Sequence, residues 1–291
     1  FIDHNEEFDF DTDEQCQELL RVAEKWNGHD DGRIRVDAGI HAEYTSNYKL
    51  WEGLVGYAHE KGLGFQLHLG STPEEVESCL DRTGMGPGEL LNCHNVFAVP
   101  ATAAGCTYLE DYERKLLGKK KVSAVATPLA CAKSGEKSTP ILACVKSGMN
   151  VALGTGGALE CGNLDMFEVI RSAAMAERCA AKNPAALPSA AALMMATFSG
   201  AQAQGRAAEC GMLVEGMDAD IALIDFSAPH LLPCHNVLNA LVYSVKGGDV
   251  ALTMVRGQIL YQNGQFPTID LKSVVEELTT YAIPKLFEDN K

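Results

Sequence analysis

The chain has 291 residues, of which 46% are hydrophobic and 22% are charged, and its formal net charge at pH 7 is -15. This is enough apolar material for a buried core in one large or two modest domains. The acidic balance argues against a nucleic-acid partner, and no apolar run reaches the ~18 residues that a membrane span needs.

Helix-like and strand-like segments alternate along the first two-thirds of the chain. Helical spacing is found at residues 14–26, 48–61, 73–82, from 109, at 139–147 and at 164–181. Strand-like segments lie between them, at residues 33–41, 64–69, 96–101, 122–126 and 150–153. This alternation predicts a parallel α/β sheet, and in a barrel of this kind the turns after the strands carry the chemistry.

After Pro188 the pattern changes. Residues 190–197 and 200–205 are Ala-rich and helical, residues 221–224 are an apolar strand, and residues 249–255 and 258–261 form a hairpin. A tail helix is expected from Leu271. The last third therefore predicts a small β-layer beside the barrel.

Ten cysteines are scattered singly along the chain, without a CxxC pair. This distribution is typical of reduced and mostly buried thiols, so we expect a cytoplasmic protein.

Several short strings, taken in their order and spacing, resemble the amidohydrolase superfamily, and most of all its methylthioadenosine/S-adenosylhomocysteine deaminases and chlorohydrolases. They are GIHAEYT (39–45), LHL (67–69), GTGGA (154–158), NLDMF (163–167), GMDAD (216–220) and SAPHLLP (227–233). The resemblance implies a (β/α)8 TIM-type barrel with a β-sandwich built from both chain ends. We expect a partial barrel at residues 1–205, a sandwich portion at 206–265 and a helix and tail at 266–291.

Members of this superfamily extend further at the N-terminus, where they carry a His-x-His metal pair. This chain contains no His-x-His. We therefore expect an upstream segment, a partner that supplies the rest, or an incomplete barrel. Because a partial barrel leaves strand edges unpaired, we also expect a homo-oligomer.

The resemblance implies a site in which zinc or iron activates water for attack on a ring carbon. His68 matches the metal-binding histidine, and His41 matches the substrate-contacting histidine of the preceding strand. The arginine that grips the far end of the substrate falls near Gln15, and the nearest arginine is Arg21.

The remaining matched positions depart from the superfamily pattern. Ser71 stands in place of the proton-shuttling glutamate. Val99 or a neighbour, which we expect at the carboxyl end of its strand, stands in place of the histidine that polarises the substrate. Ala126 replaces a histidine, and Gly156 replaces the aspartate that binds metal and accepts a proton. A hydroxyl has no acid–base pKa near neutrality, and glycine has no side chain, so these functions are lost.

Cys106, Cys131 and Cys161 all follow predicted strands, and with His68 they could form a site for a soft metal. No short ligand spacing supports such a site, so we favour the interpretation that these thiols fill space left by lost imidazoles.

Two functional hypotheses follow. In the first, the chain is a nucleoside-deaminase-like protein with a degenerate metal site, inactive as a metal-dependent deaminase, with no cofactor and with a small-molecule ligand. In the second, it is an active hydrolase of C–N bonds in a purine- or triazine-like ring. Its site would then be reorganised or completed upstream, with zinc or iron.

Overall fold

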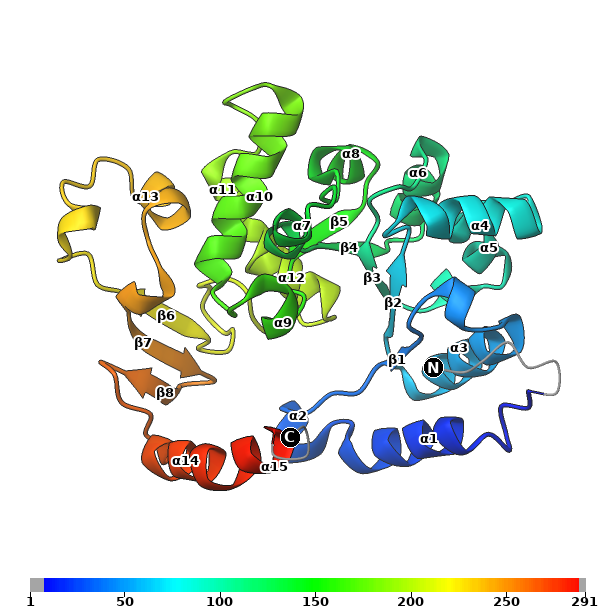
Figure 1. Cartoon of the computed structure of the whole chain (residues 1–291), viewed down its shortest axis with the longest axis horizontal. Helices are drawn as coiled ribbons and strands as arrows, with labels where there is room; N and C mark the ends of the chain where they lie inside the picture. Colours follow the sequence, from blue (N-terminus) through cyan, green and yellow to red (C-terminus); the bar gives the residue numbers. More distant parts are fainter. Residues whose placement is uncertain (1–7, 288–291) are drawn as a thin grey trace.

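A parallel five-stranded sheet forms the centre of the protein, which is described here from a computed structural model covering residues 8–287. The strands lie in sequence order: β1 (Ala38–Gly39), β2 (Phe65–Leu69), β3 (Ala101–Gly105), β4 (Ser123–Ala126) and β5 (Asn150–Leu153). Within residues 8–287, β1 and β5 are the two edges of this sheet, so the barrel is not closed (Figure 1).

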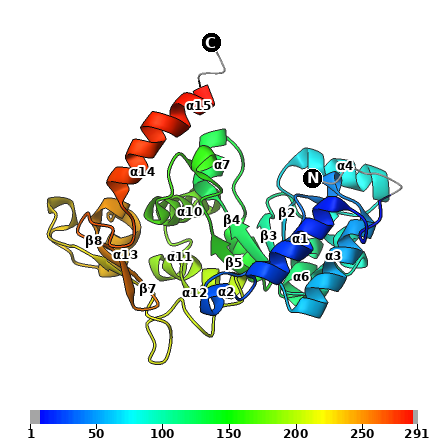
Figure 2. The ribbon, with the colours of Figure 1, turned by 90° about the horizontal axis from the view of Figure 1, so that it is seen from below.

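Helices connect the strands and pack on the sheet (Figures 1 and 2). The connecting helices are α3 (Tyr48–Lys61), α4 (Pro73–Thr83), α5 (Pro87–Cys93), α6 (Asp111–Lys119), α7 (Pro128–Ser134) and α8 (Ile141–Lys146). Before β1 lie α1 (Glu14–Trp26) and α2 (His29–Gly32), and after β5 come α9 (Ala158–Cys161), α10 (Met166–Ala181), α11 (Ser189–Met195) and α12 (Phe198–Ala203).

The two faces of β2 explain why one side of the sheet is covered and the other is open. Phe65, Leu67 and Leu69 are buried in the core, whereas Gln66 and His68 between them are exposed. This period of two is the pattern of a strand with one face against helices. The exposed face is the one that a closed barrel would enclose, and it positions the site described below.

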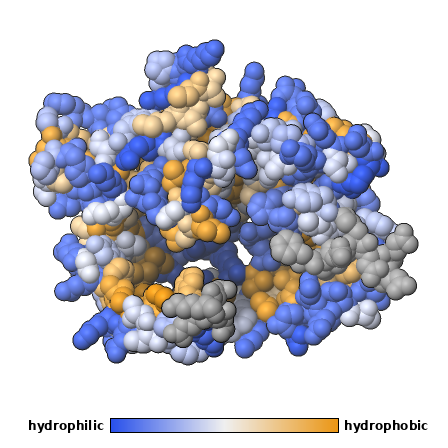
Figure 3. All heavy atoms as spheres, viewed as in Figure 1, coloured by the Kyte–Doolittle hydropathy of each residue, from blue (hydrophilic) through white to orange (hydrophobic). Residues whose placement is uncertain are grey.

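A second sheet and a tail complete the chain. Strands β6 (Ile221–Ile224), β7 (Val250–Val255) and β8 (Gln258–Gln262) form an antiparallel sheet, with α13 (Val237–Tyr243) between β6 and β7. The tail comprises α14 (Leu271–Glu277), a π-helical stretch (Leu278–Ala282) and α15 (Ile283–Phe287). It runs along the lower edge of Figure 1, and the space-filling view shows a gap between it and the main body (Figure 3).

Most predicted elements are confirmed to within a few residues, but two strands differ. The strand expected at residues 33–41 is confined to Ala38–Gly39. The strand expected at residues 96–101 is wrong, because Val96–Ala98 is a 3-10 turn and the strand is Ala101–Gly105. The apolar run at 96–99 resembled a strand, whereas Ala and Gly, which make up β3 apart from Thr102, have low β propensity. No helix within residues 8–287 is long and apolar enough to cross a membrane.

Candidate functional site

Two histidines lie side by side where β1 and β2 end. His41 is two residues beyond β1, and its backbone carbonyl accepts the N–H of His68 at 2.8 Å. The two imidazole rings have their centroids 5.2 Å apart, and Tyr44 makes an edge contact with His41 at 5.8 Å. Both histidines therefore lie at the carboxyl ends of their strands, where their matched positions were expected, and their rings are neighbours.

The hydrogen bonds of these rings indicate which nitrogen carries the proton. His68 Nδ1 lies 3.2 Å from the carbonyl oxygen of His41, which can only accept, so Nδ1 is the donor, and in the neutral ring Nε2 carries the lone pair. His41 Nδ1 lies 3.0 Å from Thr45 Oγ1, and the Thr45 hydroxyl donates to the carbonyl of Ala42. Burial, and then repulsion between the imidazolium forms of His41 and His68, lower the pKa of His41 from its ordinary value, which favours a neutral His41 imidazole at pH 7.

The turns that carry both histidines are held by a single helix, α4. Glu75 accepts the backbone N–H groups of Gly70 and Ser71 at 2.7 and 2.8 Å, and burial raises the pKa of this carboxyl group. Arg82, two turns later on α4, donates to Glu43 at 2.7 Å, and Glu43 is buried in the turn after His41. Hydrogen bonds made by Glu75 and Arg82 on α4 therefore hold the turns after both histidines.

The other three strands end without polar side chains. The residues that pair with His68 in successive strands of the sheet are Ala104 on β3, Val125 on β4 and Ala152 on β5. The strand-end position of β3 is Gly105, whereas Val99 lies before the strand, at its opposite end. The placement of Val99 at the carboxyl edge is therefore wrong, because the strand begins five residues later than predicted.

The space beside the α-carbon of Gly105 is occupied by the side chain of Ser71. Its φ is +96°, and a β-carbon built there would overlap with Ser71 Oγ and lie 3.2 Å from the carbonyl oxygen of Leu69. Ser71 Oγ is buried and has no hydrogen-bond partner within residues 8–287. Ser71 thus occupies the space beside Gly105.

A neighbouring side chain also lies beside Gly156, three residues after β5 ends. Gly156 has a φ of +79°, and a β-carbon there would lie 2.9 Å from Glu160 Oε2, on α9. Ala126, at the end of β4, is fully buried. Gly105 at the end of β3, Ala126 at the end of β4 and Gly156 after β5 therefore contribute no side-chain ligand, and a carboxylate from α9 lies beside Gly156.

The alternative thiol site is not assembled. Cys106 follows β3 directly, but Cys131 lies within α7 and Cys161 at the end of α9. Burial raises the pKa of Cys106 well above its usual value and also raises that of Cys131, which disfavours the thiolate that a metal needs. Across residues 8–287, no three His, Cys, Asp or Glu side chains are grouped so that they could hold a metal. These residues do not fit a four-coordinate zinc centre.

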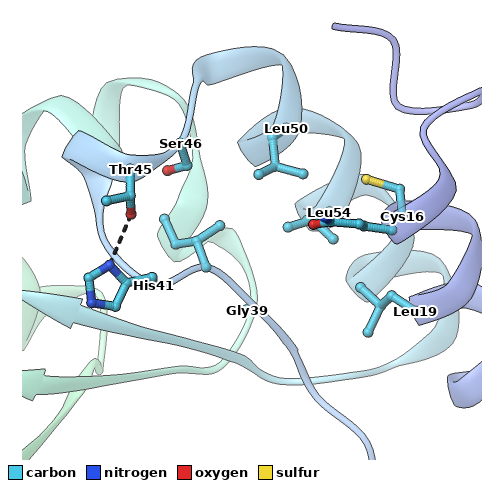
Figure 4. Close-up of a pocket in the computed structure, with 10 residues that line it drawn as sticks. Cys16, Leu19, Gly39, His41, Thr45, Ser46, Leu50 and Leu54 are labelled. Carbon is cyan, nitrogen blue, oxygen red and sulfur yellow. Dashed lines mark hydrogen bonds between the residues drawn. The ribbon is translucent and has the colours of Figure 1, made fainter. Parts of the chain in front are cut away.

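A pocket of about 300 Å³ lies beside His41, between α1, the turn after β1, and α3. Figure 4 shows His41 and Thr45 at one end and Leu19, Cys16 and Leu54 at the other. Gln15, where the substrate-gripping arginine was expected, also lines this pocket. Arg21 pairs instead with Glu18 at 2.6 Å, and both side chains are largely exposed.

Comparison with known proteins places this arrangement in a family. The profile of the Amidohydrolase family matches residues 3–260. The chain belongs to the amidohydrolase family. It is 35% identical to a 5-methylthioadenosine/S-adenosylhomocysteine deaminase of Caldanaerobacter subterraneus over 92% of its length, and 36% identical to a 5'-deoxyadenosine deaminase of Methanosarcina acetivorans over 91%. It spans only 62% and 61% of these relatives.

Solved structures of amidohydrolases share the fold. An adenosine deaminase from Xanthomonas campestris with bound zinc superposes with a TM-score of 0.87 at 26% identity, covering 92% of this chain and 60% of that one. The atrazine chlorohydrolase of Arthrobacter aurescens superposes with a TM-score of 0.83 at 24% identity, covering 90% and 58%. The predicted TIM-type architecture is thereby confirmed, with the barrel open in the described residues.

Sequence reasoning missed Glu43, Glu75 and Arg82, which hold the histidine turns. Glu75 carried a signal, because Thr72-Pro73 marks a helix start and an acid at the third helical position reaches back to the turn. The pairing of Glu43 with Arg82, 39 residues apart, had no local signal.

Proposed function

We propose that this amidohydrolase-family chain binds a small ligand of the nucleoside class and does not deaminate it through a metal. The observation that carries this proposal is the set of strand-end residues. His41 and His68 supply imidazoles, whereas Gly105, Ala126 and Gly156 supply no ligand. Water activation by zinc needs about three protein ligands and an open position.

The two histidines at the ends of β1 and β2, His41 and His68, support a role in ligand binding. Neutral His41 and His68 Nε2 offer hydrogen-bonding groups on the exposed face of the sheet, beside the pocket at Gln15. A purine presents ring nitrogens and an amino group that such groups can recognise. The deaminases named above act on nucleosides, which makes this ligand class the one to test.

Metal analysis and an ammonia-release assay test the proposal together. The purified chain is dialysed, analysed for zinc and iron, and incubated with methylthioadenosine and with S-adenosylhomocysteine. The Caldanaerobacter relative serves as the positive control. We expect no stoichiometric metal and no ammonia, with nucleoside binding detected by calorimetry. Stoichiometric metal with ammonia release would refute the proposal and direct attention to ligands outside the described residues.

We further propose that copies of the chain associate. The edges of β1 and β5 are unpaired in the described part of the chain, and open strand edges favour pairing. The tail also exposes apolar side chains, such as Leu271 at 50% and Leu286 at 68%. Sedimentation velocity over a concentration series is expected to detect a dimer or larger species, and a monomer at every concentration would contradict this.

A further inference from the structure

We infer that the tail, residues 271–287, pairs in antiparallel orientation with the tail of a second copy of the chain. The inference rests on the proposed association of copies and names the surface through which they meet. Figure 2 shows the tail extending away from the rest of the chain, and none of its residues is buried. Because helices in proteins are stabilised mainly by packing of an apolar face, the tail needs a surface to pack against.

The apolar residues of the tail fall into two groups that are out of step for a continuous α-helix. The first group has spacings of three and four residues, and it comprises Leu271, Val274, Val275 and Leu278. The second group follows Leu278 at five, eight and nine residues, and it comprises Ile283, Leu286 and Phe287. In an α-helix, side chains share a face at intervals of four, seven and eight residues, so the second group comes one residue late.

The π-helical stretch at Leu278–Ala282 removes this mismatch. A π-helix closes its hydrogen bonds over one more residue than an α-helix, so it takes up the extra residue. Ile283 and Leu286 thereby return to the face of Leu278. Lys285, seven residues after Leu278, is turned away from that face, and its Nζ donates to the hydroxyl of Tyr281 at 3.0 Å.

The sequence accounts for the wider turn. Pro284 has no N–H and cannot form the α-helical hydrogen bond to the carbonyl four residues earlier. The hydroxyls of Thr279 and Thr280 donate to the carbonyls of Val275 and Glu276 at 2.8 and 2.7 Å. In a regular α-helix these carbonyls would accept the backbone N–H groups of the same threonines, so the hydroxyls loosen the backbone ladder. The single apolar face is therefore encoded locally.

The face is exposed along its whole length. Leu278 is 48% exposed, Leu286 68% and Phe287 65%. The remaining members are 42–50% exposed: Leu271, Val274, Val275 and Ile283. A contiguous apolar surface of this kind marks an interaction site.

The charges beside the face favour a second tail over a lipid surface. Helices that lie on membranes are rich in Lys and Arg on their polar side, whereas the tail balances Lys272 and Lys285 against Glu276 and Glu277. Glu277, Tyr281 and Lys285 follow one another at intervals of four residues along one flank. With two tails antiparallel about Tyr281, Glu277 of each tail lies opposite Lys285 of the other, whereas a parallel pair would bring like charges to the same level.

The same alignment also pairs the apolar groups. Val275 of one tail lies at the level of Phe287 of the other, and Leu278 lies within one residue of the level of Ile283. Ala282, near the centre, leaves room for the two backbones to approach. Because a two-fold axis makes both halves of such a contact equivalent, the tail is complementary to itself.

Sedimentation velocity of the full chain over a concentration series tests the contact. We expect a dimer with a dissociation constant on the order of 10 μM, as for a small interface. Leu278→Asp places a carboxylate in the centre of the face and should weaken the dimer by about tenfold or more. Ser273→Asp introduces the same residue off the face and should change the dissociation constant by less than about twofold. Leu286→Asp repeats the test at a residue that is 68% exposed, where folding does not depend on the side chain.

Cysteine cross-linking tests the orientation, with the natural chain under the same oxidant as the baseline. Ala282→Cys lies near the two-fold axis and is expected to form a cross-linked dimer above that baseline. Leu271→Cys would lie about 30 Å from its counterpart in the antiparallel pair, at 1.5 Å per residue, and should not. Equal cross-linking of the two variants would overturn the antiparallel arrangement.

The outcomes separate this inference from the proposed association. A dimer that is unchanged in both Leu278→Asp and Leu286→Asp would overturn tail pairing and leave association through the strand edges intact. An equal loss in Ser273→Asp would also overturn it, because the apolar face would not be the contact. A natural chain that is monomeric at every concentration would overturn the association and the pairing together, and would assign the face to a different partner.

Discussion

The two halves of the carboxyl edge of the sheet differ in how they are maintained. In the half formed by β1 and β2, His41 and His68 keep their imidazoles, and Glu75 and Arg82 on α4 hold the turns behind them. In the half formed by β3 to β5, the residues at or just after the strand ends, Gly105, Ala126 and Gly156, are small. There Ser71 and Glu160 occupy the space beside Gly105 and Gly156. The first half is thus supported by α4, whereas in the second half neighbouring side chains lie where β-carbons of Gly105 and Gly156 would be.

The largest effect is expected from returning an imidazole to β3. Gly105→His places a β-carbon against Ser71 Oγ at a φ of +96°, a backbone conformation that side-chain-bearing residues rarely adopt. Strain and overpacking together should lower the free energy of unfolding by about 3 kcal/mol. Urea denaturation measures this loss.

Gly84→His is the matched control for that variant. Gly84 also has positive φ, +71°, but a β-carbon there meets nothing within 4 Å. We expect it to lose only about 1 kcal/mol, the backbone share of the cost. Equal losses in the two variants would mean that Ser71 does not block the position beside Gly105.

The next largest loss of unfolding free energy is expected in the β1–β2 half, where α4 holds the histidine turns. Arg82→Met leaves the carboxylate of Glu43, which is 1% exposed, without its cation. Breaking a fully buried pair costs about 3–5 kcal/mol. Because Arg82 is itself 43% exposed, we expect about 2 kcal/mol, measured as a shift of the urea midpoint at constant slope.

A double variant distinguishes the lost pair from lost packing. Glu43→Gln combined with Arg82→Met removes the stranded charge, so it should be more stable than Arg82→Met alone by about 1 kcal/mol. Additive losses from the two single substitutions would show that Glu43 and Arg82 do not depend on each other.

The contrast between the two halves also explains what could be predicted from the sequence. The family and most strands were predictable because alternation and motif order are local properties, and His41 and His68 lie within recognisable strings. Val99 was misplaced because β3 is built from alanine, threonine and glycine, which give a weak strand pattern, whereas the preceding apolar run gives a strong one. The support by Arg82 could not be predicted, because its partner is 39 residues away.

A smaller, pH-dependent effect is expected at Glu75. Burial raises the folded-state pKa of this group above its ordinary value of 4.5. The stability it contributes is therefore fully present below that value and is lost as the pH rises through the folded pKa. Glu75→Gln abolishes this titration and costs about 1 kcal/mol, because its NH2 group cannot accept and one of the hydrogen bonds from Gly70 and Ser71 is lost.

The stability of the natural chain relative to Glu75→Gln should therefore be greatest below pH 4.5 and fall as the pH rises toward 7. The pKa of His41 is lowered, so its contribution has the opposite sign, being lost as the pH falls, but it is common to both chains and cancels. A difference that stays constant across this range would mean that Glu75 titrates like an exposed carboxyl group.

The smallest effect is expected where an acid is returned to the end of β5. Gly156→Asp must adopt a φ of +79° and places its β-carbon 2.9 Å from Glu160 Oε2, a flexible group that can move aside. We expect a loss of about 1 kcal/mol, close to that of Gly28→Asp, a control whose φ is +77° with open space around it. We also expect no stoichiometric zinc after dialysis, because one carboxylate added to His68 leaves too few ligands for a closed site. Retention of about one zinc per chain by Gly156→Asp, but not by the natural chain or by Gly28→Asp, would contradict this. It would mean that the β3–β5 half lacks only a single side chain, and that the remaining ligands come together when that side chain is present.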